Sequence, residues 1–243
     1  MQIILPMAGR GSRFADSAFG LPKPLIEVAG KPMLFWALDS LQAFDGNRLI
    51  LVVLEEHEQQ YGIRNRVQQY LDGRSFSLEV VQIPAVTEGQ LCTVLAARHL
   101  LEDEEDVLIA ASDTFIRGPL ANDIRHKGAD CAGLISVNRL PGEQWSFARA
   151  DESGVVLEVA EKRRISEHAS NGLYYFSRAA DLIAYGENMI RNNERTRGEF
   201  FVIPVYQKMI EAGLKILLSH ADEMWDMGTP EAKAAFEHHL QKK

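Results

Sequence analysis

A glycine-rich loop with cationic side chains lies near the start of the sequence. It reads Ala8-Gly9-Arg10-Gly11-Ser12-Arg13-Phe14 and is followed by Pro22-Lys23-Pro24-Leu25. Glycines let backbone N–H groups approach a phosphate closely, and two cations a loop apart can neutralise a triphosphate from two sides. The combination therefore indicates phosphate chemistry.

Two well-known phosphate loops and one plain alternative compete for this segment. A dinucleotide fingerprint needs a small residue where Phe14 stands and an acid ending a second strand about 20 residues on, but the next candidate strand comes too late. A P-loop ends in Gly-Lys followed by Ser or Thr, whereas this loop ends in Gly11-Ser12-Arg13. A glycine turn with two surface cations remains as the alternative for the loop taken alone.

Two aspartates stand where a divalent metal could be held. Mg²⁺ prefers one or two carboxylates together with substrate oxygens and water. Asp113 follows the apolar run 107–111, so we expect it at the carboxyl end of a parallel strand, where open α/β sheets bind ligands. Asp226 lies in Trp225-Asp226-Met227-Gly228-Thr229-Pro230, just before a predicted helix. Each acid alone is more often a turn former or a helix cap than a metal ligand.

The elements that position these residues change in pattern along the chain. In the first half, short apolar runs alternate with amphipathic stretches, which is typical of strands joined by crossover helices in a mostly parallel sheet. The predicted strands are 3–7, 49–54, 78–83, 107–111 and 131–137, and the predicted helices are 32–44, 56–71, 90–101 and 119–126. The predicted fold class is therefore α/β, with a Rossmann-like, mostly parallel sheet flanked by helices.

The pattern changes after about residue 140. Segments 147–149 and 155–161 flank the turn-like Asp151-Glu152-Ser153-Gly154, which predicts an antiparallel hairpin and the start of a smaller, mixed lobe. Beyond it we expect a strand at 172–176, helices at 178–190 and 200–212, a last strand at 216–219 and a final helix after Pro230. The lack of a Pro- or Ser-rich linker predicts one continuous fold.

Composition excludes several classes of protein. With 243 residues, 46% of them apolar, the chain can bury a full core, so disorder is excluded. No apolar run approaches the roughly 20 residues that span a bilayer, and the first residues do not resemble a secretory signal, so we expect a cytoplasmic protein without a membrane partner. Cys92 and Cys131 are expected to be buried free thiols, and the net charge of −8 argues against nucleic acid as a partner.

The loop and the acids together resemble a known family, the sugar-1-phosphate nucleotidyltransferases or sugar-nucleotide pyrophosphorylases. Its opening signature is a Gly-x-Gly-x-Arg loop followed by Pro-Lys-Pro, matched here by Gly9, Gly11, Arg13 and Pro22-Lys23-Pro24. Residues 5–14 look most like the short stand-alone members found in capsule and lipopolysaccharide gene sets. The resemblance covers nearly the whole chain and is strongest over 2–30 and 107–114. It implies the nucleotide-diphospho-sugar transferase fold, with 1–140 as nucleotide-binding core and 141–243 as acceptor-binding lobe with closing helices.

The resemblance also implies an activity and a set of site residues. The activity is a Mg²⁺-dependent transfer of NMP from an NTP to a small phosphorylated substrate, a sugar 1-phosphate, with release of pyrophosphate. Arg13 would hold the β- and γ-phosphates, Lys23 the α-phosphate, and Asp113 with Asp226 the Mg²⁺. Nucleotide contacts are expected from Ala8, Gly9, Gly11, Ser12, Gln82, Glu88 and Gly89. Acceptor contacts are expected from Glu161, Lys162, Asn171 and Gly172, although Arg163 stands where the family has proline.

Structural explanations compete for some of these positions. A helix cap at Thr87 accounts for residues 87–90 nearly as well as a base-reading loop does. An ordinary strand with a turn glycine accounts for Asn171 to Tyr174.

Two other functions stay open at this point. One is a cytidylyltransferase acting on phosphocholine or another small non-sugar phosphate, for which Glu199, Phe200, Phe201 and Tyr206 are candidate contacts to a cationic head group. The other is a sensor that binds a nucleotide sugar without turnover, which has no need of paired metal acids and both loop cations. The sequence leaves open the NTP base, the acceptor and whether the chain forms a homo-oligomer.

Overall fold

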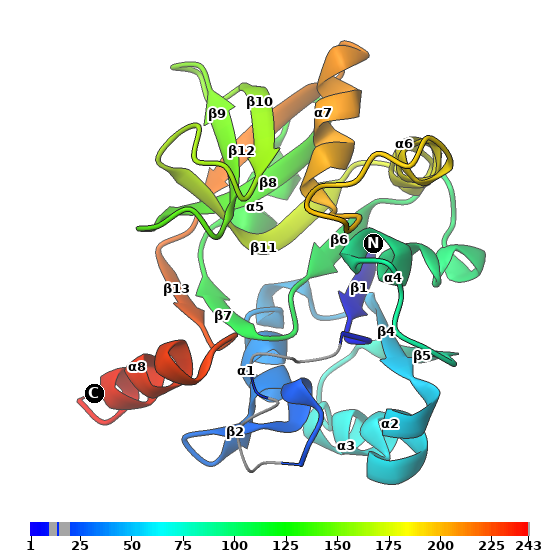
Figure 1. Ribbon diagram of the computed structural model, residues 1–243, viewed down its shortest axis with the longest axis vertical. Coiled ribbons are helices and arrows are strands. Elements are labelled where there is room, and N and C mark those ends of the chain that lie inside the picture. The colour runs from blue at the N-terminus through cyan, green and yellow to red at the C-terminus, as the bar shows by residue number, and fades with distance from the viewer. Residues whose placement is uncertain (10–13, 15–19, 243) are drawn as a thin grey trace.

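The computed structural model describes residues 1–9, 14 and 20–242, which form a nine-stranded sheet at the centre (Figure 1). The strand order is β10-β9-β11-β6-β1-β4-β5, and β8 pairs with both β11 and β12. Helices cover the sheet on both faces, so the predicted α/β class is confirmed. Among the described residues, none of the helices is both long and apolar enough to cross a bilayer.

The first half of the chain supplies the parallel strands. β1 pairs in parallel with β4 and β6, and β4 pairs in parallel with β5. Ile3 and Leu5 pack with the helices on one face of the sheet, whereas Ile4 packs on the opposite face. Because both faces are covered, β1, β4 and β6 are almost continuously apolar, whereas the edge strand β5 keeps exposed polar residues. The elements are β1 (Gln2–Pro6), α1 (Met33–Asp39), β4 (Arg48–Leu54), α2 (Glu55–Tyr61), α3 (Ile63–Tyr70), β5 (Ser77–Ile83), α4 (Gln90–Leu95) and β6 (Val107–Ala110).

The second half adds antiparallel strands to the same sheet. β11 pairs antiparallel with both β6 and β8, and β12 runs parallel to β8. The predicted hairpin is present as β9 and β10, and Asp151 Oδ1 accepts from the backbone N–H groups of Ser153 and Val155 in its turn. The elements are α5 (Leu120–His126), β8 (Cys131–Arg139), β9 (Ser146–Ala150), β10 (Val156–Glu161), β11 (His168–Phe176), α6 (Ala179–Arg191), α7 (Ile203–Glu211) and β12 (Lys215–His220). Strands from both sides of residue 140 thus share one sheet.

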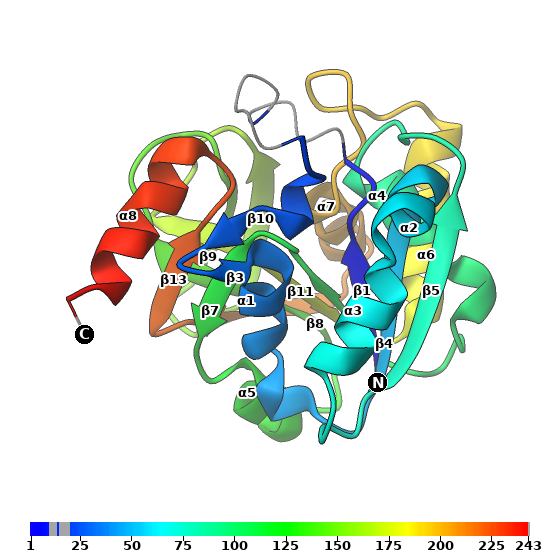
Figure 2. The same ribbon diagram turned by 90° about the horizontal axis from the view of Figure 1, so that it is seen from below.

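The helices lie on opposite sides of the parallel strands. Figure 2 shows α2 and α3 on one side of β4 and β5, with α6 on the other. Apolar residues of α3 pack with Leu49 and Leu51 of β4, and apolar residues of α6 pack in the cluster that contains Ile50 and Val52. Side chains that alternate along β4 therefore pack against helices on both faces of the sheet.

The structure differs from the sequence prediction at several boundaries. The predicted helix 56–71 is two helices, α2 and α3, separated by Gly62, which has a φ of +59°. Glycine adopts this left-handed conformation readily and so ends helices. The segment 216–219 is not the last strand, because β13 (Glu223–Asp226) follows and pairs antiparallel with β7 (Thr114–Arg117). β7, β13 and the two-residue strands β2 (Glu27–Val28) and β3 (Lys31–Pro32) are too short for a periodic signal.

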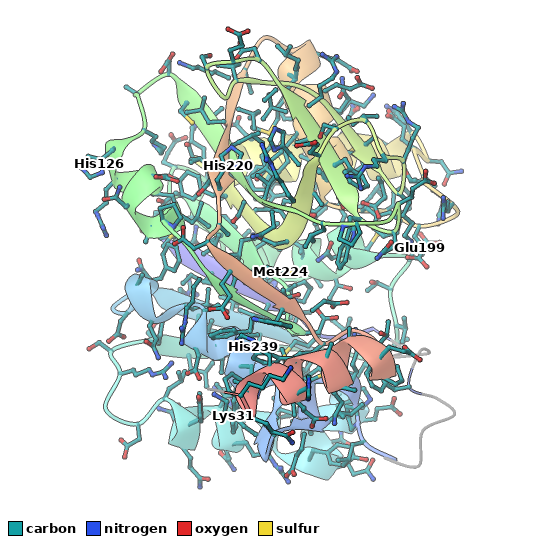
Figure 3. All side chains as sticks on the ribbon, turned by 90° about the vertical axis from the view of Figure 1, so that its left-hand side faces the viewer. Lys31, His126, Glu199, His220, Met224 and His239 are labelled. Carbon is teal, nitrogen blue, oxygen red and sulfur yellow. The ribbon has the colours of Figure 1, made fainter. Side chains whose placement is uncertain are left out.

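An aromatic cluster fixes the last helix, α8 (Pro230–Leu240), against the rest of the chain. Phe236 is fully buried, and its ring centroid lies 5.0, 5.4 and 5.6 Å from those of Trp36, Trp225 and Phe115. These rings come from α1, β13 and β7, so one side chain of α8 ties three elements together. Figure 3 shows α8, which carries the labelled His239, beside β13, which carries the labelled Met224.

Both cysteines are free thiols. Cys131 is buried as predicted, whereas Cys92 is only half-buried beside the core. Burial raises the pKa of both thiols, so each is held in its neutral form.

We expect Phe236→Ala to lower the free energy of unfolding by about 3–5 kcal/mol, because truncation leaves a cavity between three rings. Urea denaturation followed by circular dichroism measures the change. Leu157→Ala is the control, since Leu157 is 45% exposed, and its effect should stay within about 0.5 kcal/mol. Equal effects of the two substitutions would contradict the role given to the cluster.

Candidate active site

A cleft of about 880 Å³ opens at the carboxyl ends of β1 and β6. Five segments line it: residues 6–9 at the end of β1, residues 23–24, residues 111–113 after β6, residues 86–90 and 93 at the start of α4, and residues from 195 to 201 between α6 and α7. The carboxyl ends of parallel strands are where open α/β sheets bind ligands, and the volume suits a small molecule.

The pairing of β7 with β13 brings two distant aspartates together. Asp113 directly precedes β7, and Asp226 is the last residue of β13, where it faces Thr114 across the ladder. The backbone N–H of Met227 donates to the carbonyl of Asp113 at 2.9 Å and extends the pairing by one residue. The short ladder therefore positions Asp113, which lines the cleft, and holds Asp226, which is not among the lining residues, next to it.

Gly228 marks the point where Asp113, Asp226 and Lys23 meet. A Cβ at this position would lie 2.8 Å from Asp226 Oδ1, 3.2 Å from Asp113 Oδ2 and 3.3 Å from Lys23 Nζ. Lys23 Nζ donates to Asp113 Oδ2, and Gly228 N donates to Asp226 Oδ1 at 2.8 Å. The side chains of Lys23 and Asp113 are 20% and 25% exposed, so solvent screens their attraction less than it screens a surface pair.

Lys23 stands on a short, fixed turn. It begins the 3₁₀ helix Lys23–Leu25, whose next residue is Pro24 with its locked φ. Leu25 is 3% exposed in the core, and the backbone N–H of Ile26 donates to the carbonyl of Lys23 at 3.1 Å. The turn presents the ammonium group to the carboxylates with little backbone freedom.

The loop before α4 is joined to the segment between α6 and α7. The backbone N–H of Phe200 donates to the carbonyl of Glu88, and that of Leu91 donates to the carbonyl of Phe200, both at 3.0 Å. Gly89 has a φ of +144°, and a Cβ there would lie 2.4 Å from the Phe200 carbonyl oxygen, so only glycine fits. Arg195 pairs with Glu88 at 3.0 Å and lies over the Phe200 ring. Two walls of the cleft are therefore joined by backbone hydrogen bonds and an ion pair.

Thr87 does not cap α4, so that structural alternative is wrong. The N-terminal cap is Gly89, without a side-chain hydrogen bond, because Thr87 Oγ1 donates to the carbonyl of Gly89 at 2.9 Å instead of accepting from the helix. Thr87 lies in the cleft wall with Glu88 and Gly89.

Glu161 and Lys162 lie at the end of β10. Glu161 accepts a hydrogen bond from Ser146 Oγ, and burial raises the pKa of its carboxyl group. Lys162 has a φ of +52°, and its Nζ lies 4.3 Å from the centroid of the Phe201 ring, which forms part of the cleft wall. The ammonium group of Lys162 thus reaches the margin of the cleft.

Asn171 and Gly172 support the site from within β11. Asn171 is 2% exposed, and its Nδ2 donates to Ser136 Oγ and Asn138 Oδ1, both at 2.9 Å. Gly172 has a φ of +94°, and a Cβ there would lie 2.7 Å from the Cβ of Ala111 in the cleft floor. Neither residue is among those lining the cleft, so the structure gives both a supporting position.

Only some of the remaining predicted nucleotide contacts line the cleft. Ala8 and Gly9 line the cleft, whereas Gln82 is an exposed residue of β5 that does not. Gly11, Ser12 and Arg13 lie outside the described residues, so their predicted roles stay predictions.

Several lining residues were not predicted as site residues. Ser112 and Arg195 carry polar groups into the cleft wall. Arg195 lies in a polar run with Asn192 and Asn193 that looked only like a connection between helices. The run gave no periodic or motif signal that could have marked it.

The four residues proposed for a cationic head group do not lie together. Glu199 and Phe201 line the cleft. Phe200 is 1% exposed, and Tyr206 is fully buried with its hydroxyl donating to the Tyr175 carbonyl at 2.9 Å. The prediction is therefore wrong for Phe200 and Tyr206, because their rings belong to the core.

A metal ion at this site would depend on the two aspartates. Within residues 1–9, 14 and 20–242, no three side chains of His, Cys, Asp or Glu form a group that could hold a metal ion alone. A metal held by Asp113 and Asp226 would need oxygens from a ligand to complete its coordination, which is the preference of Mg²⁺.

Comparison with known proteins gives a consistent result. The family described as Nucleotidyl transferase matches residues 1–243. The chain is 27% identical over 192 residues to the mannose-1-phosphate guanylyltransferase catalytic subunit beta of Dictyostelium discoideum, covering 73% of this chain and 50% of that protein. It is also 27% identical over 241 residues to the bifunctional protein GlmU of Burkholderia pseudomallei (strain 668), covering 93% and 48%. The chain thus spans about half the length of the curated relatives it matches.

Solved structures show the same fold. The nucleoside-diphosphate-sugar pyrophosphorylase from Vibrio cholerae RC9 aligns with a TM-score of 0.83 at 24% identity, covering 98% of this chain and 100% of the other. The UTP-bound UGPase from Acinetobacter baumannii aligns with a TM-score of 0.75 at 18% identity, covering 98% and 92%.

A double-mutant cycle tests the coupling between Lys23 and Asp113. We expect Lys23→Met, Asp113→Asn and the double variant to give a coupling free energy of roughly 1–2 kcal/mol in urea unfolding, because both groups are largely buried. The matched pair Lys215 and Asp130, 40% and 66% exposed, should couple much more weakly. Equal coupling free energies in the two cycles would show that the Lys23–Asp113 pair is no stronger than an exposed ion pair.

Proposed function

The chain belongs to the nucleotidyl transferase family, and from this premise we propose that it transfers the NMP part of an NTP to a sugar 1-phosphate and releases pyrophosphate. The observation that carries the proposal is the meeting of Lys23, Asp113 and Asp226 at Gly228, beside a cleft of about 880 Å³. One cation and two carboxylates suit the handling of a triphosphate and its metal ion. We further propose that the product serves the synthesis of cell-surface polysaccharide precursors in the cytoplasm.

The residues present fit a magnesium ion. Asp113 directly before β7 and Asp226 at the end of β13 place carboxylate oxygens around one point, and Mg²⁺ takes one or two carboxylates with phosphate oxygens. These two residues would hold the ion, which would neutralise charge on the phosphate oxygens.

The reaction needs no protein nucleophile. A phosphate oxygen of the acceptor attacks the α-phosphorus of the NTP, and the bond from the α-phosphorus to the bridging oxygen breaks, so pyrophosphate leaves with the electron pair. Lys23 would bind the α-phosphate as its charge increases, and Lys162 at the cleft margin would bind the acceptor phosphate. Positioning and charge neutralisation each contribute several kcal/mol at such a site.

A phosphocholine acceptor receives less support than a sugar phosphate. A quaternary ammonium group binds best over an aromatic face, and the aromatic ring in the described cleft lining is Phe201. The Nζ of Lys162 already lies 4.3 Å from the centroid of that ring. A cation at this place favours an anionic acceptor.

A substrate grid tests the activity. Pyrophosphate release is measured with Mg²⁺ for five NTPs against hexose 1-phosphates and phosphocholine, and we expect turnover for a sugar phosphate that EDTA abolishes and Mg²⁺ restores. Turnover with phosphocholine alone would replace the proposed acceptor. No turnover anywhere, with nucleotide-sugar binding intact, would favour the sensor. Turnover that survives EDTA would remove the metal from the proposal.

Gly228→Ala tests the meeting point itself. The added Cβ would push Asp113, Asp226 and Lys23 apart, and we expect kcat/KM to fall by roughly 10- to 100-fold, since displacements of about 1 Å have effects of that size. The control is Gly154→Ala in the β9–β10 turn, where φ is +84° and no atom lies within 4 Å. It should lower stability and leave kcat/KM within about twofold, because strain there stays local. A loss of kcat/KM in Gly154→Ala with none in Gly228→Ala would contradict the assignment of Lys23, Asp113 and Asp226 to the active site.

A further inference from the structure

A second cleft of about 680 Å³ lies between the end of β10 and the start of α7. Its lining includes Glu161 and Lys162, which were predicted as acceptor contacts, and its charge is unlike that of the rest of this acidic chain, whose net charge is −8. Four lining residues are basic and two are acidic: Lys162, Arg163, Arg164, Arg197, Glu143 and Glu161. The local excess of positive charge points to an anionic ligand.

Neighbouring hydrogen bonds hold two of the cations in place, and one of the acids also accepts a hydrogen bond. Arg164 Nη1 donates to the carbonyls of Leu140 and Gly142, both at 2.9 Å, and Arg197 Nη2 donates to the carbonyl of Lys162 at 3.1 Å. Glu161 accepts a hydrogen bond from Ser146. The guanidinium groups are therefore held in place before any ligand arrives, which lowers the cost of ordering them.

The two clefts share one wall. Arg195, Gly198 and Glu199 line the first cleft, whereas Thr196 and Arg197 between them line the second. Lys162 lines the second cleft, and its Nζ reaches Phe201 in the wall of the first. Both Lys162 and Arg197 hold left-handed backbone conformations, with φ of +52° and +49°. Such conformations are costly for residues other than glycine and often occur where a segment has a functional position.

We propose that the second cleft is an anion site for a phosphate or diphosphate group, and that its occupant acts on the acceptor side of the first cleft through Lys162. Guanidinium groups bind phosphate oxygens in pairs and with directional hydrogen bonds, so a cleft with three arginines suits this chemistry. The second part of the proposal rests on the proposed function, because it takes Lys162 as the acceptor cation. The anion site itself does not depend on the proposed function.

Arg163→Glu tests the site, and Arg149→Glu is the matched control. Both arginines bind Glu158, at 3.0 and 3.1 Å, but only Arg163 lines the second cleft. The two variants carry the same net charge. Inorganic phosphate and inorganic pyrophosphate are titrated separately by calorimetry, and the two arms distinguish free phosphate from the released product.

We expect one anion-binding event to weaken by about tenfold or more in Arg163→Glu and to change by less than about twofold in Arg149→Glu, since a charged hydrogen bond is lost in the first. Unchanged binding in Arg163→Glu, with a melting temperature like that of the control, would overturn the site.

The coupling is tested with the acceptor found by the substrate grid. Inorganic phosphate should change KM for the acceptor in the wild type and in Arg149→Glu, but much less in Arg163→Glu, with each variant compared with its own rate without phosphate. Anion binding without any change in KM would overturn the coupling. If no substrate in the grid is turned over, the proposed function and the coupling both fail. The calorimetric titration would still show whether the second cleft binds an anion.

Discussion

The candidate active site depends on one short antiparallel ladder. β7 and β13 are four residues each, yet their register places Asp226 opposite Thr114 and so beside Asp113. The parallel sheet alone could present only Asp113, because Asp226 comes from a segment that does not belong to the nine-stranded sheet. Packing of Phe236 against Trp225 and Phe115 stabilises both strands of the ladder. The geometry of the site is thus a consequence of tertiary packing and not of the sheet alone.

The sequence predicted the parts of the fold that carry long periodic signals. Strands such as 49–54 and 107–111 are continuous apolar runs, and their positions are confirmed within a few residues. The ladder of β7 and β13 was missed because four alternating residues do not differ from a loop in pattern. The division of helix 56–71 at Gly62 was missed for another reason, since an isolated glycine inside a helical pattern is tolerated and does not by itself mark the end of a helix.

Site residues that belong to a sequence motif were predictable. Site residues that only tertiary contacts bring to the cleft were not. Lys23, Asp113 and Asp226 were predicted from motif and family order, and the structure brings all three to one point. Asn171 and Gly172 matched a motif, but they lie behind the cleft floor. Arg195 lies in the cleft wall because backbone hydrogen bonds join the loop at Glu88 to the segment at Phe200. No local sequence pattern predicts these long-range contacts.

The late position of β13 in the chain has a consequence for biosynthesis. A nascent chain emerges from the ribosome with its amino-terminal part first, so the parallel strands, Lys23 and Asp113 can assemble before Asp226 has been translated. During that interval Lys23 and Asp113 can form their ion pair, but the partner carboxylate is still missing. The growing polypeptide would therefore hold an incomplete candidate active site until β13 is made.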